Sequence, residues 1–212
     1  MNKYSHIFFD LDRTIWDFDK NSIATLNEIF EKYNLENILN CSFDDFFKTY
    51  KKHNTILWEA YRNNQIKKEK LSIDRFLFTL NDFNNDDLLL ASNISEDYIK
   101  LSPLKKNLLP YSIETLEILS KKFKLHILTN GFKEVQYIKV RKSGLEKYFT
   151  HIITSEEAGV QKPDKKIFEY ALKITGATPE NSIMIGDDLK VDILGAMQVG
   201  MDQIYFNCNS DP

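Results

Sequence analysis

Residues 6–14 read His-Ile-Phe-Phe-Asp-Leu-Asp-Arg-Thr, a short apolar run followed at once by two carboxylates and a hydroxyl. Such a run is typical of a strand in a parallel sheet, where helices cover both faces and the strand is buried on both sides. Three further apolar runs, at 125–128, 152–153 and 183–185, also precede polar segments. Because open parallel sheets bind ligands at the carboxyl ends of their strands, the sequence predicts that these four distant segments meet in one cleft.

The first and second halves of the chain carry different patterns. Between residues 18 and 101 the apolar residues follow helical spacing and no convincing strand is found, whereas strands alternate with helices from residue 108 onward, with a fifth strand at 203–206. Gly144, Gly176 and Gly200 each follow a periodic segment and are expected to end a helix. We therefore expect an α/β core at 1–16 and 104–212, interrupted at 17–103 by an all-helical cap that can open and close over a substrate.

Composition excludes several classes of protein. The net charge is -3 and only four of the 212 residues are arginine, which argues against a nucleic-acid polymer as partner because no basic surplus exists to neutralise phosphates. No apolar stretch approaches the ~20 residues needed to span a bilayer, so we expect no membrane partner. Cys41 and Cys208 lie far apart and no secretory leader is visible, which favours a reducing, cytoplasmic location. The sequence does not fix an oligomeric state.

Asp10 and Asp12 stand two residues apart at the end of the first strand. Alone, this pair is weak evidence, since acidic pairs after strands often serve loop solvation or helix capping. An aspartate carboxylate can, however, attack phosphorus, and a second carboxyl group can protonate the leaving oxygen and later deprotonate water. The other polar segments favour this second interpretation.

Thr129, Asn130 and Gly131 follow the second strand, and Lys162 precedes Pro163 after the third. A hydroxyl and backbone amides that open a helix form a site for phosphate oxygens, although the same residues would also suit a simple helix start. A lone lysine is usually solvated. Beside a group of aspartates, Lys162 is instead a candidate to bind both the nucleophile and the phosphoryl group.

Asp187, Asp188 and Asp192 crowd the end of the fourth strand. Such carboxylates repel one another unless a cation is present, and hard oxygen ligands suit Mg²⁺. The alternative is that Asp188 and Asp192 bond the start of the following helix and its dipole.

The four segments, in this order and with a helical insert after the first, resemble the haloacid-dehalogenase-like superfamily in its branch with an N-terminal inserted helical cap. The resemblance implies a Rossmann-like three-layer α/β core whose parallel sheet has the strand order 3-2-1-4-5. It also implies that Asp10 is the nucleophile and a Mg²⁺ ligand, and that Asp12 is the general acid and base, with a backbone carbonyl on the metal. Thr129 and Lys162 would hold the phosphoryl group, Asp187 would be the second side-chain ligand, and Asp188 and Asp192 would lie in the outer shell.

A closer resemblance, to the pyrimidine 5'-nucleotidase branch, is carried by four segments, at 127–132, 155–172, 192–196 and 57–61. This resemblance implies a phosphomonoesterase acting on pyrimidine nucleoside monophosphates. One departure is Arg13, because many relatives place glycine after the acidic pair. Trp58, Tyr61 and Phe132 are candidates to stack on a base, although aromatic residues at helical spacing more often belong to a core.

Other functions stay open at this stage. Within the enzymes they are a sugar-phosphate phosphatase, a phosphomutase or a dehalogenase; the dehalogenase is disfavoured because it would need neither Asp12 nor the aspartate trio. Outside the enzymes, a catalytically silent binding protein is disfavoured because every reacting position carries a competent residue.

Overall fold

The computed structural model describes residues 3–207, which leaves Cys208 outside the described residues. The chain divides into two compact units, one made of Met1–Asp19 with Lys105–Pro212 and the other of Lys20–Leu104. We call them the core unit and the helical unit. The boundaries expected from the sequence, 16/17 and 103/104, lie three residues and one residue before these divisions.

The core unit is built on one parallel sheet of five strands in the order β3-β2-β1-β4-β5, which confirms the expected topology. The central strand β1 pairs with β2 on one side and β4 on the other, so that Phe8 lies beside both His126 and Met184. The strands are β1 (His6–Phe9), β2 (Lys124–Thr129), β3 (Phe149–Thr154), β4 (Ser182–Gly186) and β5 (Asp202–Tyr205).

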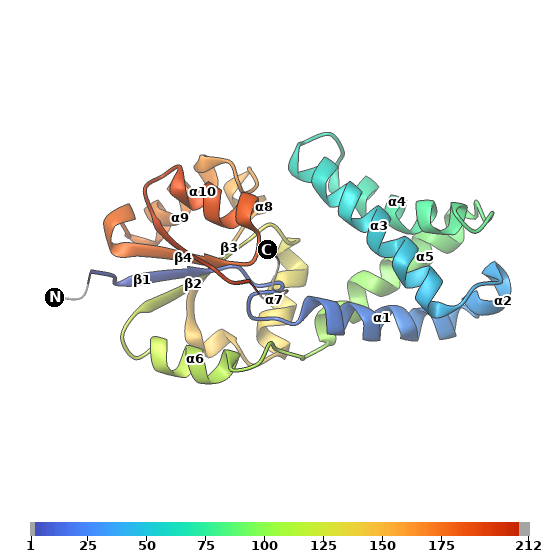
Figure 1. The fold of residues 1–212 in the computed structure, drawn as a ribbon, viewed down its shortest axis with the longest axis horizontal. Coiled ribbons are helices and arrows are strands. Elements are labelled where there is room, and N and C mark those ends of the chain that lie inside the picture. The colour runs from blue at the N-terminus through green and yellow to red at the C-terminus, as the bar shows by residue number, and fades with distance from the viewer. Residues whose placement is uncertain (1–2, 208–212) are drawn as a thin grey trace. The chain divides into compact units, whose positions relative to one another are not determined.

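Helices cover both faces of this sheet and give it three layers (Figure 1). Successive side chains of β1 point to opposite faces. Ile7 and Phe9 pack in one apolar cluster with Leu116 of α6, whereas Phe8 packs in another with Phe168 of α9. The helices of this unit are α6 (Ser112–Leu119), α7 (Lys133–Lys142), α8 (Ser155–Ala158), α9 (Lys165–Thr175) and α10 (Leu194–Met197), with the short helical turns η2 (Glu146–Tyr148), η3 (Pro179–Asn181) and η4 (Leu189–Ile193).

Glycine ends the helices of the core unit where the sequence predicted it. Gly144, Gly176 and Gly200 have φ angles of 71°, 68° and 77°, a left-handed conformation that glycine adopts without the steric cost of a Cβ atom. The chain then continues into β3 and β4 through the helical turns η2 and η3, and from Gly200 into β5.

The helical unit has an apolar core of its own. Leu26, Phe46, Phe76 and Ile94 come from four different helices and are all fully buried in one cluster. The helices are α1 (Phe18–Lys32), which starts at the end of the core unit, α2 (Leu35–Leu39), α3 (Phe43–Arg62), α4 (Lys68–Asn81), α5 (Leu88–Leu101) and the turn η1 (Ser102–Leu104). The absence of strands from 18 to 101 is confirmed.

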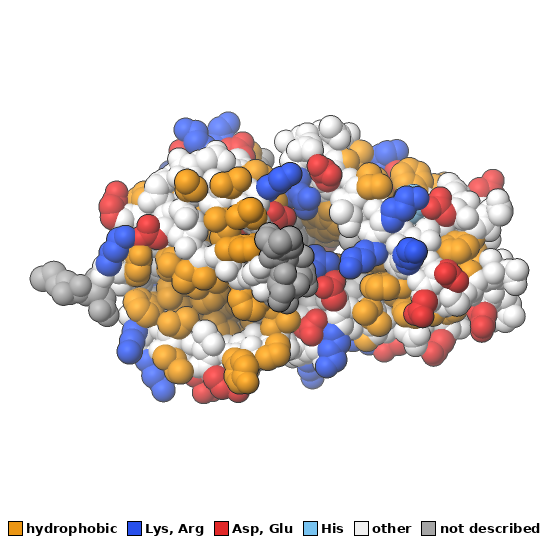
Figure 2. Space-filling model, in the orientation of Figure 1, with side chains coloured by type: hydrophobic (Ala, Val, Ile, Leu, Met, Phe, Trp, Pro, Cys, Tyr) orange, Lys and Arg blue, Asp and Glu red, His pale blue; other side chains and the backbone are white. Residues whose placement is uncertain are grey.

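Hydrophobic side chains are also gathered on the surface of the core unit that Figure 2 presents. Exposed residues of this unit include Leu194 and Met197 on α10 and Ile204 on the edge strand β5. Among the described helices, none is both long and apolar enough to cross a membrane.

Candidate active site

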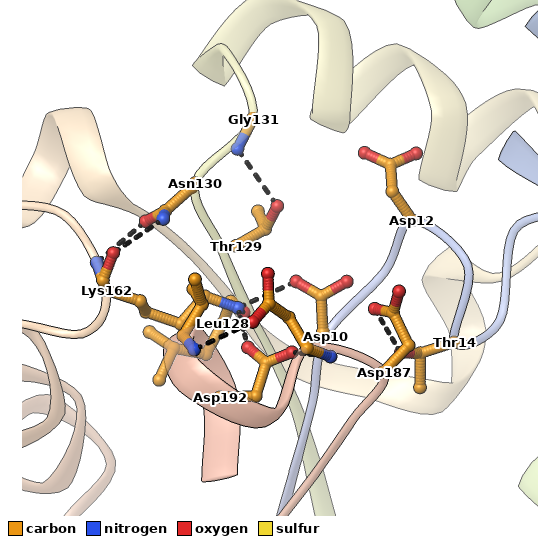
Figure 3. Close-up of polar contacts among 12 residues, drawn as sticks. Asp10, Asp12, Thr14, Leu128, Thr129, Asn130, Gly131, Lys162, Asp187 and Asp192 are labelled. Carbon is orange, nitrogen blue, oxygen red and sulfur yellow. Dashed lines mark hydrogen bonds and ion pairs between the residues drawn. The ribbon is translucent and has the colours of Figure 1, made fainter. Parts of the chain in front are cut away.

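The four polar segments meet at the carboxyl ends of the strands, all within the core unit (Figure 3). Asp10 follows β1, Thr129 is the last residue of β2, and Asp187 follows β4. The backbone amide of Asp10 donates to the carbonyl oxygen of Ile185 at 2.9 Å, which extends the pairing of β1 with β4 to the start of the acidic loop. The sheet therefore fixes the position of Asp10 relative to the end of β4.

Lys162 is a buried cation at the centre of this group. Its side chain is 1% exposed, and Nζ donates to Oδ1 of Asp10 at 2.7 Å, to Oδ1 of Asp192 at 2.6 Å and to the carbonyl oxygen of Leu128 at 2.7 Å. Burial opposes the charged form, but the attraction of Asp10 and Asp192 outweighs it and raises the pKa of Lys162 above its ordinary value. The ammonium group thus has all three of its hydrogen bonds satisfied and stays charged.

The side chain of Asn130 forms hydrogen bonds with the backbone of Lys162. The side-chain amide of Asn130 donates to the carbonyl oxygen of Lys162 at 2.9 Å, and its Oδ1 accepts from the Lys162 amide at 2.8 Å. The peptide bond between Lys162 and Pro163 is cis. These two bonds use Oδ1 and one of the two N–H groups of the Asn130 side chain, so this side chain holds the backbone of Lys162 in place.

Three carboxylates form a group that fits a divalent cation. Asp10, Asp187 and Asp192 each place one oxygen within 4.8 Å of the others. Burial, followed by repulsion from Asp192, raises the pKa of Asp187 to about 6, and burial also raises the pKa of Asp10 well above its usual range. The Thr14 hydroxyl donates to Oδ1 of Asp187 at 3.4 Å. Crowded, hard oxygen donors of this kind match the ligand preference of Mg²⁺.

Asp188 and Asp192 have different surroundings, although the sequence placed both in the outer shell. Oδ1 of Asp188 accepts from the amides of Lys190 and Val191 at 3.0 Å, so Asp188 caps η4, as the alternative interpretation predicted. Asp192 turns back into the carboxylate group, where a Cβ atom on Gly186 would lie 2.3 Å from its Oδ2. Glycine at 186 therefore leaves the space that the Asp192 carboxylate occupies.

The loop after β2 offers donors rather than a helix cap. Thr129 is buried, and its Oγ1 accepts from the amide of Gly131 at 3.1 Å, which leaves the hydroxyl hydrogen free to point elsewhere. The N-cap position of α7 belongs to Phe132, without a side-chain capping bond. The simple helix-start interpretation of Thr129 and Asn130 is thus wrong for their side chains.

Asp12 lies apart from the group of three carboxylates, and its carboxylate points toward α7 (Figure 3). Its Oδ1 accepts from Nζ of Lys139 at 2.6 Å, and its Oδ2 accepts from Nε2 of Gln136 at 2.9 Å. Neither partner of Asp12 was predicted from the sequence. A signal was present, because residues 136, 139 and 140 have the i, i+3, i+4 spacing of the buried face of a helix, and two of them are polar.

A family model for haloacid dehalogenase-like hydrolases matches residues 4–200. The chain belongs to this family. It is 32% identical over 209 residues to the pyrimidine 5'-nucleotidase YjjG of Escherichia coli strain K12, a match that covers 98% of this chain and 88% of that protein.

Two further comparisons are informative. The glyceraldehyde 3-phosphate phosphatase of Pyrococcus furiosus is 32% identical over 207 residues, which cover 97% of this chain and 82% of that protein. The magnesium-bound crystal structure of YfnB from Bacillus subtilis superposes with a TM-score of 0.91 at 28% identity, covering 99% of this chain and 92% of that chain. The family assignment and the expected fold are therefore confirmed.

Arg13 stands where many haloacid dehalogenase-like hydrolases were expected to carry glycine. Its φ angle is 63°, in the left-handed region that favours glycine. The guanidinium group donates to both carboxylate oxygens of Asp19, at 3.3 and 3.0 Å, and lies 4.4 Å from the ring centre of Phe18. These contacts hold a bulky cation in a conformation that L-residues rarely adopt.

The three aromatic candidates for substrate recognition by this haloacid dehalogenase-like chain differ in exposure. Trp58 and Tyr61 are half-buried on α3 of the helical unit, with ring centres 5.7 Å apart in an edge-to-face contact. Phe132 is only 4% exposed. Little of its ring is exposed, and its role in stacking on a base stays a prediction.

Proposed function

We propose that this chain is a Mg²⁺-dependent phosphomonoesterase that hydrolyses nucleoside 5'-monophosphates, with pyrimidine nucleotides preferred, through an aspartyl phosphate on Asp10. The observation that carries the proposal is the buried Lys162 ammonium bonded to Asp10 beside a group of three carboxylates. A carboxylate held by a fixed cation, at the strand ends where parallel sheets bind ligands, suits nucleophilic attack on a phosphate ester.

In the first step, a carboxylate oxygen of Asp10 bonds to phosphorus while the bond from phosphorus to the ester oxygen breaks. Asp12 gives its proton to that leaving oxygen, so the alcohol departs neutral. Lys162, the Thr129 hydroxyl and the backbone amides after Thr129 offset the negative charge on the phosphoryl oxygens. In the second step, water attacks the phosphorus and Asp12 takes its proton. Inorganic phosphate leaves and the Asp10 carboxylate is restored.

The metal ligands that we propose are the side chains of Asp10 and Asp187 with the backbone carbonyl of Asp12. Asp192 lies beside Asp10 and Asp187, and we place it in the outer shell of the metal site. When bound, the cation would neutralise the negative charge of the carboxylates and of the phosphate oxygens. Activity should therefore require Mg²⁺ and disappear in EDTA, and full turnover in chelator would refute the metal assignment.

Relatives of two kinds support different substrates. The pyrimidine 5'-nucleotidases YjjG and PynA, at 32% and 28% identity, favour nucleotides. The Pyrococcus furiosus glyceraldehyde 3-phosphate phosphatase, at 32% identity, favours a small phosphosugar as the second candidate. We place discrimination in the helical unit, acting as a cap whose contacts with the remote part of the substrate add transition-state stabilisation.

The test is phosphate release from a panel of nucleoside monophosphates and sugar phosphates, measured as kcat/KM with and without Mg²⁺. We expect deoxyuridine, uridine and thymidine monophosphates to lead the panel. A phosphosugar or a purine nucleotide well ahead of every pyrimidine nucleotide would overturn the substrate assignment while leaving the phosphatase assignment standing.

Replacement of Asp10 tests the covalent mechanism. Asp10→Asn should abolish turnover with the fold intact, because an amide is not a competent nucleophile. Rapid acid quenching of the wild type should trap a phosphorylated protein that the variant does not form. Near-native turnover in the variant would exclude the aspartyl phosphate.

A further inference from the structure

Both carboxylate oxygens of Asp12 are bonded by side chains of one helix. Lys139 reaches Oδ1 and Gln136 reaches Oδ2, at 2.6 and 2.9 Å, from positions three residues apart on α7. An aspartate side chain ordinarily chooses among staggered rotamers. Two donors fixed on a single helix select one of these rotamers, so the direction of the Asp12 carboxylate is set by α7.

Lys139 is buried, and its position is itself tightly defined. Its side chain is 4% exposed, and Nζ lies 4.1 Å from the ring centre of Trp16, which is fully buried. A lysine is seldom buried unless it is paired, and Asp12 provides the ion pair. The cation is thus placed between the Trp16 ring and the Asp12 carboxylate.

Gln136 connects Asp12 to the loop proposed to bind phosphate. Its side chain fills the space over Gly131, where an added Cβ atom would lie 1.6 Å from Nε2. Its other amide atom, Oε1, is buried without a hydrogen-bond partner in the described residues. A buried amide that leaves one acceptor unsatisfied costs free energy, which argues that its orientation toward Asp12 serves more than packing.

We propose that Lys139 and Gln136 are positioning residues that direct the Asp12 carboxylate for proton transfer. This inference rests on the proposed phosphatase function, in which Asp12 protonates the leaving oxygen and later deprotonates water. Neither residue touches the reacting atoms. Their proposed contribution to proton transfer passes through Asp12, because their hydrogen bonds set the direction in which its carboxylate points.

The variants Lys139→Met and Gln136→Leu remove each donor with little change in side-chain volume. Misplacement of a reacting group by about 1 Å can cost ~10²-fold, so kcat on the best nucleotide substrate should fall roughly 10- to 100-fold in each. KM should change little, because substrate binding does not use Asp12's proton. Lys142→Met is the matched control, since Lys142 is an exposed lysine on the same helix and its loss removes the same charge.

Two readouts separate positioning from a structural effect. In single-turnover experiments, the burst of p-nitrophenol from p-nitrophenyl phosphate should be nearly unaffected by Lys139→Met, because this leaving group needs little protonation. In an Asp12→Asn background, Lys139→Met and Gln136→Leu should cause no further loss of kcat. Thermal denaturation of every variant checks that it is folded. If Lys139→Met is unstable, Gln136→Leu tests the same proposal.

Each outcome is decisive. Equal losses on nucleotide and nitrophenyl substrates, or a full additional loss in the Asp12→Asn background, would overturn the positioning role. If the wild type is active and Asp12→Asn is slow but both variants behave as wild type, the inference fails and the phosphatase function stands. If the wild type releases phosphate from no ester, both the function and the inference fail.

Discussion

Arg13 brings a fixed positive charge next to the residues proposed to bind the metal. Asp19 raises the pKa of Arg13 against the opposing effect of burial, and Asp187 and Asp12 add to this attraction. The effect is reciprocal, because Arg13 also lowers the pKa of Asp187 against the larger rise caused by burial. Because its charge interacts with Asp187 and Asp12, we expect Arg13 to oppose the binding of a divalent ion beside them.

Replacing Arg13 should therefore strengthen Mg²⁺ binding. Arg13→Gly removes the competing charge, so we expect the Mg²⁺ dissociation constant, measured by calorimetry, to fall several-fold. Relief of the left-handed backbone, worth ~1 kcal/mol, should offset the loss of the partly exposed Asp19 pair, so unfolding free energy should change little. Asp19→Asn is the opposing control and should weaken Mg²⁺ binding. Unchanged or weaker binding in Arg13→Gly would contradict the prediction.

Single residues differ in how far the sequence could predict them. Asp10 and Lys162 could be placed because each follows an apolar run, and the carboxyl ends of parallel strands share one edge. The contacts of Asp12 could not be predicted, since they depend on a side-chain rotamer and on which residues of α7 face inward. The family resemblance placed Asp192 in the outer shell, but its spacing in the sequence could not reveal its contact with Lys162.

Three neighbouring strands carry a row of histidines across one face of the sheet. His6 on β1 and His126 on β2 share a hydrogen bond of 3.0 Å between ring nitrogens, and the ring centres of His126 and His151 on β3 lie 5.3 Å apart. His126 is fully buried. Burial, followed by repulsion from His6 and His151, lowers the pKa of His126 to about 3. The sheet therefore holds this ring neutral at physiological pH.

This row should make the fold sensitive to acid. The folded pKa of His126 lies below its unfolded value near 6.5, so its contribution to stability is complete above pH 6.5 and decreases as the pH falls toward 3. For each proton taken up on unfolding, the free energy of unfolding falls by ~1.4 kcal/mol per unit decrease in pH across that window. His126→Phe should flatten the dependence of unfolding free energy on pH between 6.5 and 4, measured by urea denaturation. An identical slope in the variant would show that His126 does not titrate with unfolding.

Elements with a strong periodic pattern were predictable, and short ones were not. The apolar runs located all five strands, and the structure extends β2, β3 and β4 by one to three residues at their ends because backbone pairing continues past the apolar core. Helix α2 was missed. It has five residues between Asn34 and Asn40, both in the left-handed conformation, which is too short for a periodic signal.

At the scale of the whole molecule, we expect chemistry and recognition to lie in different units. The candidate catalytic residues all belong to the core unit, whereas the helical unit has a separate apolar core. A core that is generic for phosphate chemistry does not distinguish one ester from another, so we expect selectivity to follow the helical unit. The family resemblance could indicate this division from sequence, but no sequence pattern states which aromatic residue meets the substrate.

Trp58 and Tyr61 provide the test of this division. Stacking of an aromatic side chain on a base contributes ~1–3 kcal/mol in single-strand binders, so Trp58→Ala or Tyr61→Ala should lower kcat/KM for uridine monophosphate about tenfold. The same variants should leave kcat/KM for p-nitrophenyl phosphate within about twofold. This substrate has no base to stack on, and the reaction at Asp10 does not depend on a remote aromatic ring. Ile56→Ala is the matched control, because Ile56 is an exposed apolar residue of the same helix at 55% exposure, and both substrates should be unaffected. Parallel losses on both substrates would place Trp58 and Tyr61 in the stability of α3 rather than in recognition of the base.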